Sequence, residues 1–229
     1  MNVIIWAIST ATIATGQSPL WQGLLDETGW EDIDTETQRG VGSIAISHKV
    51  IGGIDCLTGK AHTDVPTQAL IEVATDIANT PAWSSWDVPT STLLSESNQT
   101  LRYYQLLDNP FPVRDRYWFL EGTTLSDPNT GVVEFRWNHI DPALYPAEHA
   151  EVLSRYDKAI LTTTNIGRWL FTPSHEGVSV TYQLCTDIGG AIPQWAREFA
   201  AKKSLPTNIG DLVRAGRQRN NARQTLTNP

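Results

Sequence analysis

The chain has 229 residues, 40% of them hydrophobic and 18% charged, a composition typical of one sizeable soluble domain with its own core. Its formal net charge of −8 argues against a nucleic-acid-binding protein, because such proteins carry a basic surface. Its two cysteines, Cys56 and Cys185, are too few to hold a structural zinc ion alone. They are either free and buried or, if the protein is exported, paired, and the sequence leaves both states open.

The N-terminal segment has an ambiguous pattern. Residues 3–14 form an apolar run too short to span a bilayer, and Ala14-Thr15-Gly16 is a small-x-small pattern that suits cleavage before Gln17. The lack of a basic stretch before this run argues against a signal peptide. Residues 1–17 are therefore a candidate leader, and the localisation stays open between export, to a periplasm or the exterior, and the cytoplasm.

The first third of the chain mixes helices and strands. Residues 20–36 indicate a short helix or loop with several apolar anchors in an acidic surround. A strand pair is predicted at 43–49 and 56–62, joined by the turn-rich segment Ile-Gly-Gly-Ile-Asp. Residues 66–77 carry an apolar stripe at helical spacing and predict an amphipathic helix, followed by a second short helical piece.

A run of strands follows without long interruption. The predicted strands are 92–97, 100–107, 113–124, 132–141, 159–172 and 178–188. Clusters of Asp, Asn, Pro and Gly mark the turns between them, and a longer Pro-containing connection with a helical turn spans 141–157. Helices early, antiparallel strands next and a helix last is an α+β order.

The last strand and the helix after it are the most regular part of the pattern. Strict alternation over 178–188 predicts a strand with one dry face and one wet face. Gly189-Gly190 end this strand, and a long amphipathic helix follows, with Pro206 expected to bend it and Gly216 to cap its C-terminus. A long last strand that leads through Gly-Gly into such a helix is typical of the helix-grip fold.

These residues resemble a known family. The run Val-Thr-Tyr-Gln-Leu-Cys-Thr-Asp-Ile-Gly-Gly-Ala-Ile-Pro-Gln-Trp, which ends at Trp195, is similar to the end of START domains, the lipid-transfer domains related to the steroidogenic acute regulatory protein. Upstream, Pro112-Val-Arg-Asp-Arg-Tyr-Trp118 and Trp86-Asp87 also resemble segments of that family. The resemblance covers roughly residues 21–219. It implies one START-like domain at 18–219 with a polar tail at 220–229, and a curved antiparallel sheet wrapped around the C-terminal helix with an internal apolar cavity.

Large apolar side chains share the faces that would line such a cavity. On the strands these are Trp118, Leu120, Phe135, Trp137, Trp169, Phe171, Val180, Tyr182 and Leu184. On the helix they are Trp195, Phe199, Ile209 and Val213. A cavity of about 300–1,000 Å³ would suit a small hydrophobic ligand, although the pattern alone does not distinguish an empty gap from a filled one. We therefore predict these residues as ligand contacts, with His139 as a polar tip among them.

Charged candidates are few. In some START domains an internal basic–acidic pair contacts a ligand head group, so the resemblance makes Arg114 and Arg116 candidates for a polar head-group contact. The second cavity arginine of the steroidogenic protein is replaced here by Leu120, which departs from that pattern.

Motifs for catalysis are not found. The sequence has no phosphate-binding Gly loop, no Gly-x-Ser-x-Gly elbow and no His-Glu-x-x-His, and its five histidines lack metal-ligand spacing. We predict no catalytic residue, no metal and no cofactor.

The leading hypothesis is a non-enzymatic, monomeric carrier that encloses one lipid, such as a sterol, between sheet and helix. A loop at 125–131 and the Pro206-bent helix are the candidate gates. One alternative is a helix-grip enzyme of the cyclase or aromatase type, for which His139 and Tyr182 are the only acid–base candidates. A second alternative is a lipid-sensing module.

The basic end of the chain gives a further expectation. From Arg197 onward seven Lys/Arg stand against two Asp/Glu. This stretch is either a solvated helix face or a patch for transient contact with an anionic membrane.

Overall fold

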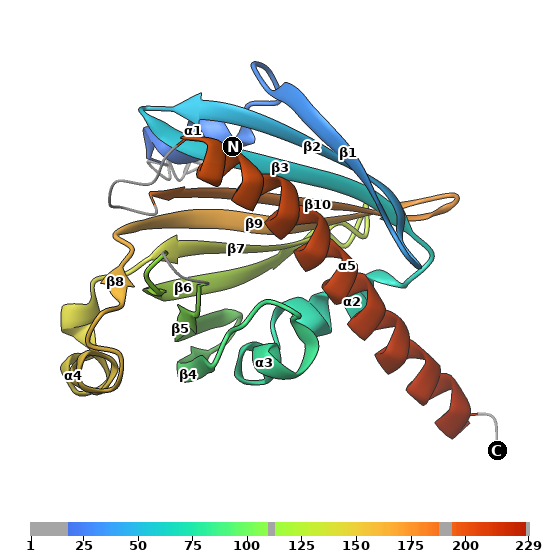
Figure 1. Cartoon of the computed structure of the whole chain (residues 1–229). Coiled ribbons are helices and arrows are strands. Elements are labelled where there is room, and N and C mark those ends of the chain that lie inside the picture. The colour runs from blue at the N-terminus through green and yellow to red at the C-terminus, as the bar shows by residue number, and fades with distance from the viewer. Residues whose placement is uncertain (1–17, 110–112, 188–193, 228–229) are drawn as a thin grey trace, which may run out of the picture.

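The computed structural model describes residues 18–109, 113–187 and 194–227, with side chains described for 202–225 of the last range. A ten-stranded sheet dominates the molecule (Figure 1), in the order β1-β2-β3-β10-β9-β7-β6-β5-β4 with the short β8 beside β6. The strands are β1 (Glu31–Gln38), β2 (Gly42–Ile51), β3 (Ile54–Thr63), β4 (Thr90–Ser97), β5 (Thr100–Leu107), β6 (Arg116–Ser126), β7 (Val133–His139), β8 (Ile160–Leu161), β9 (Thr164–Ser174) and β10 (Gly177–Asp187).

The helices lie on both faces of this sheet. They are α1 (Pro19–Leu25), α2 (Thr67–Ala74), η1 (Ile77–Asn79), α3 (Thr80–Trp83), η2 (Pro142–Leu144), α4 (Pro146–Arg155) and α5 (Gln194–Thr227). None of the helices within the described ranges has the length and apolar character needed to cross a bilayer.

Helix α5 lies across what we call the inner face of the sheet (Figure 1). Its residues Leu205, Ile209, Leu212 and Val213 are fully buried in the main core. Gly59 on β3 permits this close approach, because a Cβ at that position would lie only 2.7 Å from Cδ1 of Ile209. The C-terminal part of α5 packs against α2. The end of α5 projects beyond the sheet.

The opposite, outer face is covered by two short helices. Helix α1 covers the disulfide-bearing strands β3 and β10, where Trp21, Leu24 and Ile166 form a small second core. Helix α4 covers a third cluster on β5 and β6 that includes Phe119 and Tyr117. The side chains of one strand therefore enter different cores according to which face they occupy.

The α+β helix-grip architecture expected from the sequence is confirmed. The predicted strand at 159–172 is wrong in one respect, because it is divided into β8, which pairs in parallel with β6, and β9. The segment 20–36 is also more than a short helix or loop, since β1 begins at Glu31. This edge strand is mostly exposed, so it lacks the alternation of apolar residues that would reveal it.

Two expectations about the end of the chain are also corrected. Gly216 does not end α5, which continues through Thr227 and so includes most of the predicted polar tail. A Cβ at Gly216 would lie 3.1 Å from Val65 and 3.3 Å from Leu70, so this glycine serves close packing of α5 on α2. Similarly, the predicted wet face of β10 is covered by α1, which leaves Gln183 fully buried.

Candidate ligand-binding site

The centre of the inner face is a wall of aromatic rings. In the register of the sheet Phe135 on β7 lies opposite Trp169 on β9, and Trp169 lies opposite Tyr182 on β10. The Trp169 and Tyr182 rings stack with centroids 4.0 Å apart and planes 19° apart. Trp137 contacts Tyr182 at a centroid distance of 5.9 Å. Four large rings therefore form one continuous apolar surface across three strands.

The structure brings most of the predicted ligand contacts together. One core cluster contains Leu120, Phe135, Trp137, Trp169, Phe171, Val180, Tyr182, Ile209 and Val213. Trp118 and Leu184 pack against it while partly buried. Trp195 and Phe199 are in α5, but their side chains lie outside the described residues. That these residues touch a ligand stays a prediction.

His139 is the most informative polar residue near this wall. It ends β7, two residues beyond Trp137 and on the same face of the strand. Its Nδ1 atom is buried and has no hydrogen-bond partner among the described residues. Burial lowers the pKa of this imidazole, against the opposing charge of Asp141, so the neutral form is favoured. A neutral ring nitrogen in this position is suited to bond a ligand oxygen.

The two predicted head-group arginines differ in burial. Arg116 is buried, and its Nη1 donates to the carbonyl oxygens of Arg114 and Asp115 at 2.5 and 3.2 Å. Burial lowers the pKa of this guanidinium, with Arg114 adding to the effect and Asp115 opposing it. Arg114 is exposed and donates to the carbonyl oxygen of Lys158 at 2.6 Å. The structure thus separates a buried Arg116 from an exposed Arg114.

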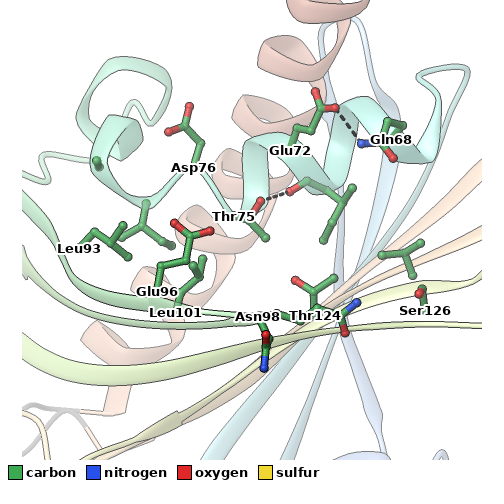
Figure 2. A pocket seen from close by; sticks show the side chains of 15 residues that line it. Gln68, Glu72, Thr75, Asp76, Leu93, Glu96, Asn98, Leu101, Thr124 and Ser126 are labelled. Atoms are coloured by element: carbon green, nitrogen blue, oxygen red, sulfur yellow. Dashed lines mark hydrogen bonds between the residues drawn. The ribbon is translucent and has the colours of Figure 1, made fainter.

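A hollow of about 530 Å³ opens at the end of the inner face that lies under α2 (Figure 2). It lies between α2, η1, the β4–β5 hairpin and the adjoining ends of β6 and β7. Its lining residues are Gln68, Ile71, Glu72, Thr75, Asp76, Ile77, Ala78, Leu93, Glu96, Asn98, Gln99, Leu101, Thr124, Ser126 and Val133. Sequence reasoning missed this hollow, because its lining comes from four separate stretches of the chain, 68–78, 93–101, 124–126 and Val133.

A second, smaller hollow of about 310 Å³ lies beside α1. It is lined by Ser18, Pro19, Leu20, Ile51, Gly52, Ile54 and Thr164. Neither hollow lies between the aromatic wall and α5, whose buried side chains belong to one core cluster.

The basic end of α5 is engaged with acidic residues of neighbouring elements. Arg219 pairs with Asp76 and Arg223 with Glu72, which places two arginines behind the wall of the larger hollow. Arg217 pairs with Asp64 at 2.5 Å, and this bond holds the pKa of Asp64 below its usual value. The predicted basic patch is therefore partly neutralised within the molecule.

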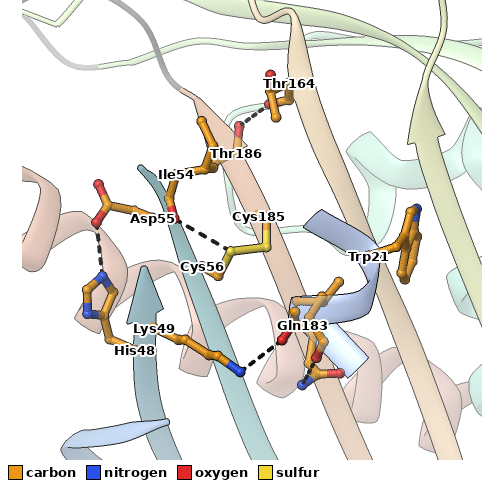
Figure 3. Close-up of a disulfide and its surroundings, with 12 residues drawn as sticks. Trp21, His48, Lys49, Ile54, Asp55, Cys56, Thr164, Gln183, Cys185 and Thr186 are labelled. Carbon is orange, nitrogen blue, oxygen red and sulfur yellow. Dashed lines mark hydrogen bonds and ion pairs between the residues drawn. A yellow bond between two sulfur atoms is a disulfide. The ribbon is translucent and has the colours of Figure 1, made fainter. Parts of the chain in front are cut away.

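The cysteines that the sequence left open form a disulfide (Figure 3). Cys56 and Cys185 lie opposite each other in the pairing of β3 with β10, with Cα atoms 4.1 Å apart. Both are fully buried on the outer face beneath α1, where the Nε2 of Gln183 donates to the carbonyl oxygen of Leu24. The disulfide thus reinforces the sheet opposite the aromatic wall.

This architecture was compared with those of known proteins. No family model matches the chain. An uncharacterized protein of Pseudomonas aeruginosa is 32% identical over 120 residues, which are 52% of this chain and 54% of that protein, so the match spans about half of the relative's length.

Solved structures match over most of the chain. The STAR-related lipid transfer protein of Xanthomonas axonopodis superposes with a TM-score of 0.67 at 21% identity, covering 82% of this chain and 99% of that one. Human StAR-related lipid transfer protein 5 gives a TM-score of 0.71 at 12% identity, covering 88% and 92%. The chain therefore has the helix-grip α+β fold of the START lipid-transfer domains.

Proposed function

We propose that this protein is a non-enzymatic lipid carrier that holds one hydrophobic molecule between the inner face of the sheet and α5. The observation that carries the proposal is the continuous ring surface of Phe135, Trp137, Trp169 and Tyr182 beneath a separate helix. The START-like fold supports a lipid-binding domain. A ligand that buried about 300 Å² of apolar surface would gain roughly 7.5 kcal/mol from burial at about 25 cal/mol per Å².

Binding at the wall requires α5 to move away from it, because the rings and the described apolar residues of α5 are buried in one core cluster. Pro206 lies within α5 and cannot donate a backbone hydrogen bond to the preceding turn. Gly210, one turn later, adds backbone freedom. We propose that this part of α5, together with the loop at 125–131, forms the gate.

The polar contact that we favour is His139. Its orphaned Nδ1 would bond a hydroxyl or carbonyl oxygen of the ligand, as a sterol or another neutral lipid would present. Arg116 is the second candidate, since its charge is buried.

The absence of catalysis is part of this proposal and is supported by the state of one of the two acid–base candidates, Tyr182. Burial raises the pKa of the Tyr182 hydroxyl well above its ordinary value, which moves it away from the range useful for proton transfer near neutral pH. This supports binding without turnover.

Transient contact with a membrane through α5 is also proposed. Anionic lipids would have to compete with Asp64, Asp76 and Glu72 for the arginines, so the attraction would be weak and reversible.

The test is native mass spectrometry of the protein purified from its own host. A co-purified lipid at one molecule per chain is expected. A chain that carries no lipid, and that takes up none from mixed vesicles, would contradict the proposal. Conversion of the bound molecule to a new product would assign the protein to the enzyme alternative.

A further inference from the structure

The larger hollow has an apolar floor that belongs to the main core. Ile71, Ile77 and Leu101 line it and are between 5% and 8% exposed. All three belong to the same cluster as Phe135 and Phe171. Val133 lies at the margin of the hollow, on the face of β7 that also carries Phe135. The hollow is thus a place where the edge of the main core is accessible from the surface.

The rim of the hollow is polar and carries negative charge only. Of its 15 lining residues three are carboxylates, Glu72, Asp76 and Glu96, and none is Lys, Arg or His. The other polar groups are amides and hydroxyls, contributed by Gln68, Thr75, Asn98, Gln99, Thr124 and Ser126. Such a rim offers many hydrogen-bond acceptors, and its own residues contribute no cation.

The carboxylates differ in how they are held. Glu72 and Asp76 are bound by Arg223 and Arg219 from α5. Although burial opposes ionisation of Glu72, bonds from Gln68 and Arg223 hold its pKa below the usual value. Glu96 is on the exposed β4–β5 hairpin, on the other side of the hollow (Figure 2). Because Arg223 and Arg219 balance two of these charges, Glu96 is the group that would repel an anion placed in the hollow, whereas a hydroxyl or amine would find acceptors.

We infer that this hollow binds the polar head of the ligand, and that this head carries hydrogen-bond donors and no negative charge. The inference rests on the proposed function, because the apolar remainder of the ligand would extend from Val133 along the aromatic wall. His139, at the other end of β7, is then a separate contact that can be tested independently. The hollow selects the class of lipid, and the wall supplies most of the affinity.

The test compares two probes with the same acyl chain, 1-monooleoylglycerol and oleate, below their aggregation concentrations at pH 8. Each competes with a fluorescent fatty alcohol for the full-length protein. We expect monooleoylglycerol to bind at least about tenfold more tightly than oleate. Glu96→Lys should reduce this preference roughly threefold or more by improving oleate binding. Glu151→Lys on α4 is the matched control, since it makes the same charge change at an exposed site on the outer face.

Two results would overturn the inference in different ways. If oleate bound as tightly as monooleoylglycerol and Glu96→Lys acted no differently from Glu151→Lys, the hollow would not select the head group, while the proposed carrier function would stand. If neither the probes nor the fatty alcohol bound to the folded protein, the proposed function would fail, and the inference with it.

Discussion

Trp169 and Tyr182 face each other across the pairing of β9 with β10, and their rings stack at 4.0 Å. Trp137 and Phe135 continue the same surface on β7. Phe119, by contrast, is on the outer face of β6 and packs beneath α4 with Tyr104. Buried phenylalanine residues therefore lie on both faces of one sheet. Comparing them distinguishes a role in ligand binding from a purely structural role.

The first prediction compares Phe135 and Phe119, which lie on opposite faces of the sheet. Phe135→Ala and Phe119→Ala should each lower the free energy of unfolding by about 3–5 kcal/mol, because both rings are almost fully buried. Only Phe135→Ala should also weaken ligand binding by the folded protein, by about tenfold or more. Urea unfolding and lipid titration of the remaining folded fraction measure the two effects. Equal losses of affinity in both variants would show that Phe135 acts through stability alone.

The second prediction concerns pH. The pKa of His139 is lowered in the folded protein by burial, so the unfolded chain binds the proton more readily. Its contribution to stability is therefore constant well above the ordinary pKa of about 6.5 and falls as the pH drops below that value. We expect His139→Gln to lose less stability than the wild type between pH 7.5 and pH 5.5.

Thermal unfolding at a series of pH values checks this, with His175→Gln in the β9–β10 turn as the exposed control. The two variants should differ in slope. If the stability of the wild type and of His139→Gln changed in parallel with pH, His139 would have the same pKa in the folded and the unfolded protein.

The third prediction concerns the disulfide. Cys56–Cys185 closes a loop with a sequence separation of 129, so its loss should cost about 2–5 kcal/mol by relaxing the unfolded chain. The double variant Cys56→Ala/Cys185→Ala should therefore unfold at lower urea concentration. Adding a reductant during unfolding should shift the wild type toward the variant and leave the variant unchanged. If the wild type and the double variant unfolded together without reductant, the disulfide would have no net stabilising effect.

The fourth prediction concerns membranes. Lipid transfer should rise with the anionic lipid content of acceptor vesicles and fall as salt increases through the physiological range, where the screening length is about 8–10 Å. Arg223→Gln should slow transfer without changing ligand affinity, since this side chain is 52% exposed near the end of α5.

Arg102→Gln on β5 is the matched control, because that arginine is similarly exposed and also paired with a glutamate. It should leave transfer unchanged. Transfer that did not depend on salt, on vesicle charge or on Arg223 would identify the basic residues of α5 as partners of carboxylates within the molecule only.

Local pattern was sufficient for the framework of this protein. The alternation in 178–188 predicted β10. The turn residues predicted the turns between the strands that follow α3. Because side chains alternate between faces at every residue of a strand, the pattern alone also placed Phe135 with Trp137 on one face of its strand and Tyr182 with Val180 on one face of another. The resemblance to START domains then supplied the curvature and the position of the last helix, which periodicity does not encode.

Only the tertiary structure decided what covers each face and which distant groups meet. The polar face of β10 was predicted to be exposed to water, yet α1 covers it and buries Gln183 and the disulfide. Gln183 bonds to Leu24 of α1, which is 159 residues away in the sequence. Arg223 of α5 pairs with Glu72 on α2, Arg219 pairs with Asp76 just after α2, and the larger hollow is assembled from four separate stretches of the chain. Such contacts depend on how strands and helices distant in the sequence pack together, whereas a strand or the apolar stripe of a helix depends on residues within one pleat or one turn. This difference in sequence distance separates what the sequence determined from what the fold decided.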